Sequence, residues 1–275
     1  MQSSSIPSVV SQRGTIEGVI LVRLDCNPLP ARRYARLIAG RAEQMCGRYS
    51  LVTFYQDLAE EFELAEAAML PQRFNIAPTQ VVPVIRLCDS SDGFQRQLSN
   101  LRWGLIPHWA KDPSIGSKMI NARSEEAATK PSFRVPLRRQ RCLVPSTGFF
   151  EWQKVEGKTP RGFKKQPFYI RRRDEKLIAF GGLWDRWRDG DGSTIESFSI
   201  LTTSPNELIR PLHDRMPVIL QRSDYELWLD PKMQDPAKLN PLFSPFPESE
   251  MTAHPVSTRV NNTRFDDAAC IQVAV

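Results

Sequence analysis

The sequence predicts an α+β fold: a single domain with a curved, largely antiparallel, barrel-like β core and a few short helices. Two observations predict it. Short β-prone runs outnumber helical patterns along the chain, and turn-forming residues such as Asp92-Gly93 and the run 189–192 separate them. A length of 275 residues, 41% of them hydrophobic, suffices to bury one full core.

Two helices are expected. Thr53 and Gln56 have the spacing of a capping box and apolar residues follow at helical spacing, so the first helix is predicted over 54–64. Ser223 and Glu226 have the same spacing and predict the start of the second helix. The β-prone runs predict strands at 81–87, 97–103, 142–153, 167–171, 178–183, 195–202 and 216–220.

Residues 1–45 are expected to lie outside the fold, which leaves a domain at 46–272. They hold six arginines against three acidic residues, so they carry +3 of the chain's net charge of +6. Three origins stay open: a start codon assigned upstream of a true start at Met45, a leader removed before the protein acts, or a mitochondrial transit peptide. We favour the first, because Met45 sits where removal of an initiator methionine would expose the next residue.

Composition excludes several classes of protein. Five scattered cysteines without a CxxC pair, together with three histidines, argue against a disulfide framework and a zinc site, so we expect no metal and no cofactor. The same cysteine usage suits a reducing cytosol, and no apolar run approaches the ~20 residues of a membrane span. The positive charge permits nucleic-acid binding without establishing it, because a local cluster of arginines would be needed.

Cys46 carries the most informative chemistry in the chain. A methionine before a small side chain is usually removed, which would make Cys46 an N-terminal residue with a free α-amine. The pKa of such an amine is about 7.7–8.0 and that of the thiol about 8.5, so both are partly reactive at neutral pH. Together they can capture an aldehyde as an imine that closes to a thiazolidine. The alternative is a buried structural thiol.

Glu151 places one carboxylate in an aromatic β-prone run. Strand alternation predicts Phe150 and Trp152 on one face, with Phe149 and Glu151 on the other. Beside aromatic rings in a cleft, the pKa of Glu151 would be raised and suit proton transfer near neutrality. The alternative is a solubilising charge on an edge strand.

Three further polar segments are candidates. Asn121 is placed to cap a short helix whose N–H groups could face an anion. His213 lies between an acidic residue and an arginine, and supplies either a proton shuttle or a structural contact. We interpret His254 as structural, because Pro255 fixes a turn there.

Seven segments together resemble the SOS-response-associated peptidase (SRAP) family, the abasic-site processing proteins, over residues 46 to about 272. Their order and spacing match, and seven motifs in order are highly specific. The segments are Cys46-Gly47-Arg48-Tyr49, Phe74-Asn75-Ile76-Ala77-Pro78, Trp103-Gly104-Leu105-Ile106-Pro107, Asn121-Ala122-Arg123-Ser124-Glu125, Gly148-Phe149-Phe150-Glu151-Trp152, His213-Asp214-Arg215-Met216-Pro217 and His254-Pro255-Val256-Ser257.

The resemblance implies a covalent trap for abasic sites in single-stranded DNA, an activity of lyase type accompanied by a cysteine (auto)peptidase. Cys46 would be the nucleophile that forms a thiazolidine with the ring-opened sugar. Glu151 would move protons during ring opening and imine formation, and His213 would assist at the sugar oxygen. Asn121 would orient the reacting groups and Thr202 would line the site. The protein would then be a cytoplasmic monomer, associated with the nucleoid when bound to DNA.

The same resemblance implies the contacts with DNA. Arg48 and Arg123 would clamp phosphates, and Asn75 and Pro78 would line the groove. Trp109 would stack on a base beside the lesion, for which the alternative is a core tryptophan.

Two other functions stay open. Cys46, His213 and Glu151 also form the set that a thiol peptidase needs for acyl transfer. A non-catalytic module that binds single-stranded DNA would show salt-sensitive binding without a covalent adduct.

Overall fold

The computed structural model describes residues 47–64, 70–90, 93–159 and 162–274. The chain divides into two units, residues 1–42 and 43–275, and all of the described residues belong to the second unit. No helix among these residues is long and apolar enough to cross a membrane.

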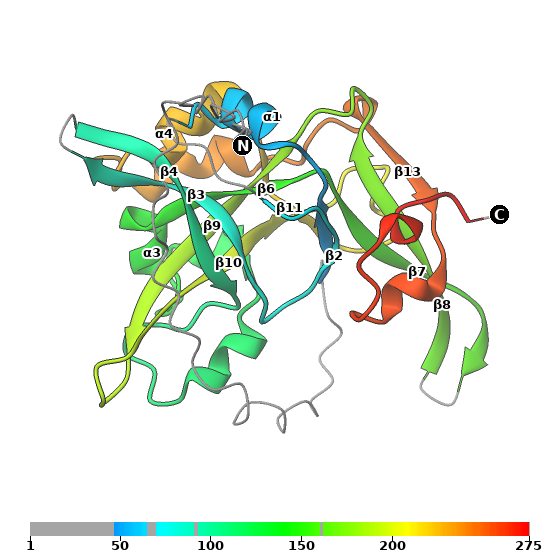
Figure 1. The fold of residues 1–275 in the computed structure, drawn as a ribbon, viewed down its shortest axis with the longest axis horizontal. Coiled ribbons are helices and arrows are strands. Elements are labelled where there is room, and N and C mark those ends of the chain that lie inside the picture. Colours follow the sequence, from blue (N-terminus) through cyan, green and yellow to red (C-terminus); the bar gives the residue numbers. More distant parts are fainter. Residues whose placement is uncertain (1–46, 65–69, 91–92, 160–161, 275) are drawn as a thin grey trace, which may run out of the picture. The chain divides into compact units, whose positions relative to one another are not determined.

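Five strands close into a barrel. They are β3 (Val81–Ser90), β4 (Gly93–Trp103), β6 (Arg141–Ser146), β9 (Ile178–Arg188) and β10 (Thr194–Thr203). Hydrogen bonding runs from β10 through β4, β3, β6 and β9 and returns to β10, and only the β10–β4 pair is parallel (Figure 1). The predicted curved and largely antiparallel core is therefore confirmed.

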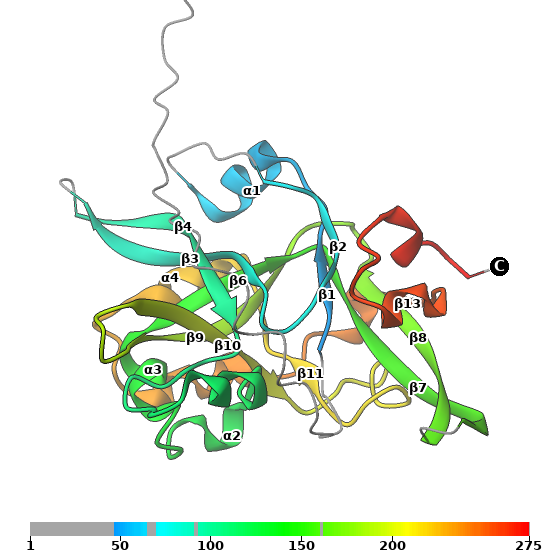
Figure 2. The ribbon, with the colours of Figure 1, turned by 60° about the horizontal axis from the view of Figure 1, so that its bottom comes forward.

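A second, fully antiparallel sheet has the order β13-β8-β7-β1-β2. Its strands are β1 (Tyr49–Leu51), β2 (Arg73–Ile76), β7 (Gly148–Thr159), β8 (Gly162–Arg172) and β13 (Met251–Pro255). β1 pairs only with the first residues of β7, and β13 pairs only with the last residues of β8. The remaining parts of β7 and β8 pair with each other alone and continue as a two-stranded extension (Figure 2).

The two sheets meet through aromatic packing. Tyr49 of β1 contacts the rings of Trp103 and Phe180 edge to face, with centroids 5.2 and 5.9 Å apart. Trp103 in turn stacks on Phe198 inside the barrel, and all four rings are buried. Edge-to-face contacts of this kind add to the free energy gained from burial alone. They fix the start of β1 against the barrel.

Two predicted strands are each divided. The run 142–153 forms β6 and β7, which belong to different sheets and separate at Thr147. At this break the Ser146 hydroxyl accepts from the N–H of Gly148 at 3.0 Å and donates to its C=O at 2.9 Å, which links the end of β6 to the start of β7. The run 216–220 forms two short strands, β11 (Met216–Pro217) with β10 and β12 (Ile219–Leu220) with β9.

The first predicted helix exists, but its predicted cap is wrong. α1 spans Tyr55–Phe62 with Phe54 at the N-cap and no side-chain capping bond. Thr53 lies one residue too early to cap, and its hydroxyl contacts the Asp57 carboxylate at 3.4 Å instead. The helix ends at Glu63, whose backbone is left-handed with φ 55°.

The second predicted helix begins later than expected. Ser223 lies within a 3-10 turn, η2 (Arg222–Asp224), and α4 (Tyr225–Leu229) follows it without a side-chain cap. The short helix expected after Asn121 is α2 (Ser124–Ala127), whereas the sequence did not predict α3 (Arg134–Arg139). The other 3-10 segments are η1 (Pro113–Lys118), η3 (Pro236–Phe243), η4 (Glu248–Glu250), η5 (Thr258–Asn261) and η6 (Ala268–Cys270).

Candidate functional site

Glu151 is a buried carboxylate on β7, with only 1% of its surface exposed. It shares a face with Phe149, which contacts Phe180 of the barrel, whereas Phe150 and Trp152 pack together on the other face. The predicted alternation is therefore confirmed. A solubilising edge charge would be exposed, so that alternative for Glu151 is wrong.

The start of β1 lies across from Glu151. β1 pairs antiparallel with β7, and the N–H of Phe150 donates to the C=O of Arg48 at 3.0 Å. One further step in this register brings Gly47, which is buried, opposite Glu151. Cys46 precedes Gly47 and lies outside the described residues.

Asn121 does not cap a helix, so that prediction is wrong. It begins β5 (Asn121–Arg123), which pairs in parallel with β10, and the N-cap of α2 is Arg123. Because Asn121 is paired within β5, its side chain cannot cap the first turn of α2, which begins three residues later at Ser124. The pairing instead places Asn121 opposite Ile200, two residues before Thr202 on β10.

Thr202 is fully buried between two neighbours of β10. It pairs with Arg123 of β5 on one side and with Pro217 of β11 on the other. Its hydroxyl donates to the C=O of Ala122 at 3.4 Å. The end of β10 therefore brings Thr202 together with the strand that carries Asn121.

Arg215 ties the same region to the loop of His213, a role that the sequence did not predict for it. Its guanidinium donates to both carboxylate oxygens of Glu125 at 2.7 Å and to the C=O of Thr202 at 2.7 Å. The hydrogen bonds from Arg215 lower the pKa of the Glu125 carboxyl. The signal was present in the sequence, since Arg215 lies within the motif that contains His213.

His213 sits in this loop with one ring nitrogen committed. Its Nδ1 accepts the backbone N–H of Arg215 at 3.1 Å and also lies 3.0 Å from the Asp214 carboxylate. A neutral ring whose Nδ1 accepts from Arg215 carries its proton on Nε2, whereas the contact with the Asp214 carboxylate suits a proton on Nδ1.

Asn75 is fully buried and does not line a groove as predicted. Its Nδ2 lies within hydrogen-bond distance of the carbonyl oxygens of Val260, Asn262 and Phe265, at 3.1, 3.3 and 2.7 Å. Its Oδ1 accepts from Arg48 at 2.9 Å. These contacts use the amide's polar atoms to hold the C-terminal segment.

Arg48 joins the same network. Its guanidinium also donates to the carbonyl oxygens of Val260 and Asn261 at 2.6 and 3.3 Å, and burial lowers its pKa. Three of its five N–H donors are thereby directed at protein groups. These contacts give Arg48 a structural role.

Three predicted DNA contacts lie near the surface. Arg123 is exposed, and Pro78 is half-buried in the connection from β2 to β3. Trp109 is 50% exposed, so it is not a core tryptophan. Its loop is anchored because Asp185 accepts from both the backbone N–H and the ring Nδ1 of His108, at 2.9 and 3.0 Å.

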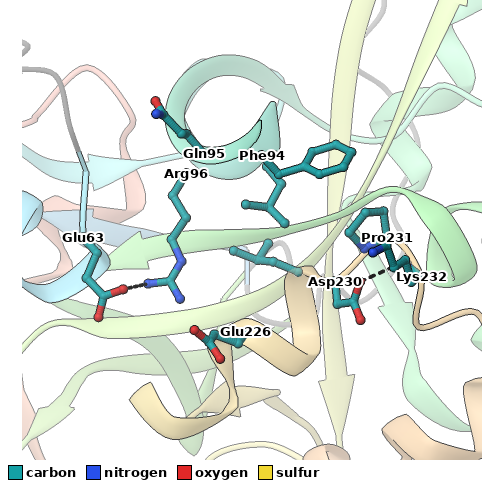
Figure 3. Close-up of a pocket in the computed structure, with 10 residues that line it drawn as sticks. Glu63, Phe94, Gln95, Arg96, Glu226, Asp230, Pro231 and Lys232 are labelled. Carbon is teal, nitrogen blue, oxygen red and sulfur yellow. Dashed lines mark hydrogen bonds and ion pairs between the residues drawn. The ribbon is translucent and has the colours of Figure 1, made fainter. Parts of the chain in front are cut away.

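A separate surface pocket has a volume of about 600 Å³. The ion pair between Arg96 and Glu63 crosses it, and Glu226 and Lys232 contribute further charges (Figure 3). None of the site residues predicted from the sequence lines this pocket, so we do not assign the chemistry to it. Among the described residues there is also no group of His, Cys, Asp or Glu that could hold a metal ion.

Comparison with known proteins identifies the family. Residues 45–263 match the model of the SOS response associated peptidase (SRAP) family. Abasic site processing protein YoqW of Bacillus subtilis is 40% identical over 233 residues, which cover 83% of this chain and 99% of that protein. Abasic site processing protein HMCES of Mus musculus is 32% identical over 237 residues, covering 73% of this chain and 65% of HMCES.

A crystal structure of a protein from Bacteroides thetaiotaomicron has the same fold, with a TM-score of 0.72 and 31% identity over 84% of this chain and all of that one. The family match spans both sheets and every segment on which the resemblance was based, Cys46 included. The chain therefore belongs to the SOS response associated peptidase (SRAP) family.

Proposed function

We propose that the protein processes abasic sites in single-stranded DNA by forming a thiazolidine crosslink through Cys46. The relatives named abasic site processing proteins support the substrate. The observation that carries the chemistry is the register of β1 and β7, which sets buried Glu151 opposite Gly47. Gly47 directly follows Cys46 in the chain, so in this proposal the amine of Cys46 reacts beside Glu151, which transfers the protons.

The reaction balances with the loss of one water. The α-amine of Cys46 attacks C1′ of the ring-opened sugar, and the resulting carbinolamine loses water to give an imine. The thiol then adds to the imine carbon and its proton passes to the nitrogen, which closes the five-membered ring. Closure removes the electron sink that would otherwise promote β-elimination, so the DNA strand stays intact.

The remaining site residues have separate roles in this proposal. Glu151 donates and accepts the protons that ring opening and water loss require. His213, whose Nε2 carries the proton when Nδ1 accepts from Arg215, serves the sugar oxygen and the reversal of the link. Asn121 orients the reacting groups beside the end of β10, and Thr202 fixes the floor of the site.

The DNA contacts extend outward from this centre. Exposed Arg123 binds a phosphate. Arg48 binds a phosphate with the N–H groups that it does not use in its contacts with the C-terminal segment. Trp109, which is half-exposed, stacks on a base. Pro78 borders the path of the strand. The protein acts as a monomer and associates with the nucleoid through its bound DNA.

Substitution of the nucleophile tests the proposal. Purified protein is mixed with a single strand containing one abasic site, and the heat-stable adduct is quantified. Cys46→Ser should abolish the adduct, because an alcohol does not close the ring. Cys88→Ser, a matched change at a half-buried thiol of β3, should leave it intact. Full adduct yield from Cys46→Ser would refute the proposal.

The family description favours a second candidate, a thiol peptidase that uses Cys46 with His213 and Glu151. Such an enzyme could release residues 1–45 from its own chain and so expose the amine. Blocking the amine of the mature protein while leaving the thiol intact separates the two candidates. Loss of the adduct supports the crosslink, whereas loss of peptide cleavage alone supports the peptidase.

A further inference from the structure

A second surface pocket opens on the barrel and is called the arginine pocket below. It has a volume of about 450 Å³, and none of the described residues of the candidate site lines it. Its walls hold three arginines against one glutamate, which gives them a net charge of +2. The lining residues come from β3, β4, β9 and β10 and are Arg86, Asn100, Arg186, Arg188, Thr194 and Glu196.

The arginine pocket lies where two barrel strands separate. β10 pairs in parallel with β4 only at Ser197 and Phe198. Before these residues, Thr194–Glu196 pairs with β9 alone, and the part of β4 before Arg102 pairs with β3 alone. The outer ends of the β3–β4 pair and of the β9–β10 pair extend to the same side and diverge (Figure 1 and Figure 2). Side chains from both pairs of strands therefore surround the pocket.

Strand alternation directs the charged side chains to the open end of the barrel. Phe198 stacks on an aromatic ring inside the barrel, and a period of two puts Glu196 and Thr194 on the same face of β10. Arg186 of β9 lies directly opposite Glu196. Arg188 lies opposite Thr194, one pair further out. The row of side chains that is apolar inside the barrel thus becomes charged where the barrel opens.

Arg86 is held in place before any ligand binds. Its Nε donates to the Ser99 hydroxyl at 2.9 Å and its second terminal nitrogen donates to Glu196 at 2.8 Å. Its guanidinium also lies over the ring of Trp184, 4.5 Å from the ring centroid. These contacts use two of its five N–H groups. A donor group fixed in this way loses little conformational freedom when it binds an anion.

Glu196 neutralises only part of the positive charge. One of its carboxylate oxygens accepts from Nε and a terminal nitrogen of Arg186 at 2.9 and 2.7 Å, and the other accepts from Arg86. One carboxylate therefore serves two guanidinium groups. The side chain of Arg188 is exposed and forms no hydrogen bond or ion pair with any described residue. The ion pairs account for two of the arginines as structural residues, and the third adds its charge to the pocket.

Other acids of β9 and its turn are engaged elsewhere. Asp185 precedes Arg186 and so lies on the opposite face of β9, where it accepts from His108 at 2.9 and 3.0 Å. Asp189 accepts two backbone N–H groups of its own turn at 2.8 and 3.0 Å. Within the described part of the chain, Glu196 is the one carboxylate that forms an ion pair with the three arginines of the pocket. The excess of positive charge is left for an anion.

We propose that the arginine pocket binds a phosphate group. The planar fork of a guanidinium matches two phosphate oxygens at once, and such charge-assisted hydrogen bonds are the strong ones. A phosphate dianion matches the net charge of +2, whereas a carboxylate would match only half of it. Asn100 and Thr194 add neutral donors at the rim. A free phosphate and a phosphodiester of a DNA strand both present this group, and the experiment distinguishes them.

Isothermal titration calorimetry of the full chain with inorganic phosphate, at constant ionic strength, tests the proposal. Arg188→Gln should weaken binding at least ~10-fold, because it removes charged donors. Arg188→Glu should abolish binding, because it brings the net charge of the walls to zero. Arg173→Gln, at an exposed arginine directly after β8, is the matched control and should bind phosphate as the wild type does. Equal urea midpoints would show that all the variants are folded.

A second titration with a lesion-free single strand that lacks terminal phosphates identifies the source of the group. If Arg188→Gln weakens binding of inorganic phosphate alone, the ligand is a free phosphate. If it weakens binding of the strand as well, the pocket accepts a phosphodiester of DNA. Equal affinities of Arg188→Gln and Arg173→Gln for both ligands would overturn the proposal, as would the absence of saturable binding to the wild type. Neither titration depends on formation of the crosslink.

Discussion

Two carboxylates near the site differ in their surroundings, and this difference assigns their roles. Glu125 accepts two hydrogen bonds from Arg215, which lower its pKa and keep it ionised near neutrality. Glu151 is buried on β7 beside the start of β1, where an ionised group has little contact with water. Two acids in such different surroundings, one paired with an arginine and one buried, commonly have different functions. Glu125 is therefore a positioning residue, and Glu151 is the candidate for proton transfer.

Replacement of Glu151, the proposed proton-transfer group, should slow the reaction without unfolding the protein. Glu151→Gln preserves the shape of the side chain, and the rate of adduct formation in a single turnover should fall by ~10²–10⁴-fold. Glu226→Gln, at an exposed position of α4, is the control and should react at the wild-type rate. A Glu151→Gln rate within a few fold of wild type would remove Glu151 from the mechanism.

Asn75 should matter for stability rather than for DNA affinity. Asn75→Ala removes the amide donor to the carbonyls of the C-terminal segment and one of the acceptors of Arg48, so it should cost ~1–3 kcal/mol in the free energy of unfolding. Asn240→Ala, at an exposed position, should change it by less than ~0.5 kcal/mol. Urea denaturation measures both. Equal midpoints for the two variants would contradict the structural role.

At the scale of elements, the long barrel strands could be predicted from the sequence, whereas the three-residue strands β1 and β5 could not. β3, β4, β9 and β10 span 10 or 11 residues each, which is enough for β-prone composition and flanking turns to be recognised. β1 and β5 span three residues each and are held by their neighbours, because β5 exists through its pairing with β10. No periodicity is detectable over three residues. The same limit explains why Asn121 was interpreted as a cap.

Gly148 marks the point where one predicted strand becomes two. A Cβ at this position would lie 2.5 Å from the Tyr169 ring and 2.6 Å from the C=O of Ile170, so Gly148→Ala should destabilise the protein by ~1–3 kcal/mol. Gly190→Ala is the control, since a Cβ there meets nothing within 4 Å. Thermal unfolding should show a lowered Tm for the first variant alone. Unchanged thermal stability of Gly148→Ala would contradict the close packing.

The barrel carries an acid-sensitive ion cluster. Glu196 accepts from Arg86 and Arg186 at 2.7 to 2.9 Å, and although burial alone raises its pKa, these contacts outweigh burial and lower it. The Glu196 carboxylate therefore binds a proton more readily in the unfolded chain than in the folded protein. The ion cluster stabilises the fold fully above a pH of about 4.5, and this stabilisation is lost as the pH falls through the pKa of Glu196 in the folded protein. The stability gap between wild type and Glu196→Gln should narrow below that pH in urea titrations. A gap independent of pH would contradict the assignment.

At the scale of the whole molecule, the candidate site draws on both sheets. β7 of the antiparallel sheet carries Glu151, and the end of β10 in the barrel carries Thr202 beside the strand of Asn121. The sequence motifs contain these residues, and their roles remain predictions from the resemblance. The motifs could not show that Arg48 and Asn75 hold a C-terminal segment about 190–210 residues later, because contacts at that separation leave no local pattern.

The identity of the first residue in the working protein decides the mechanism. Intact mass spectrometry of the active protein, before and after reaction with an abasic single strand, measures it directly. We expect a chain that begins at Cys46, and an adduct whose mass equals that chain plus the DNA minus one water. A protein that still carries residues 1–45 and nevertheless couples to the abasic strand would contradict the account.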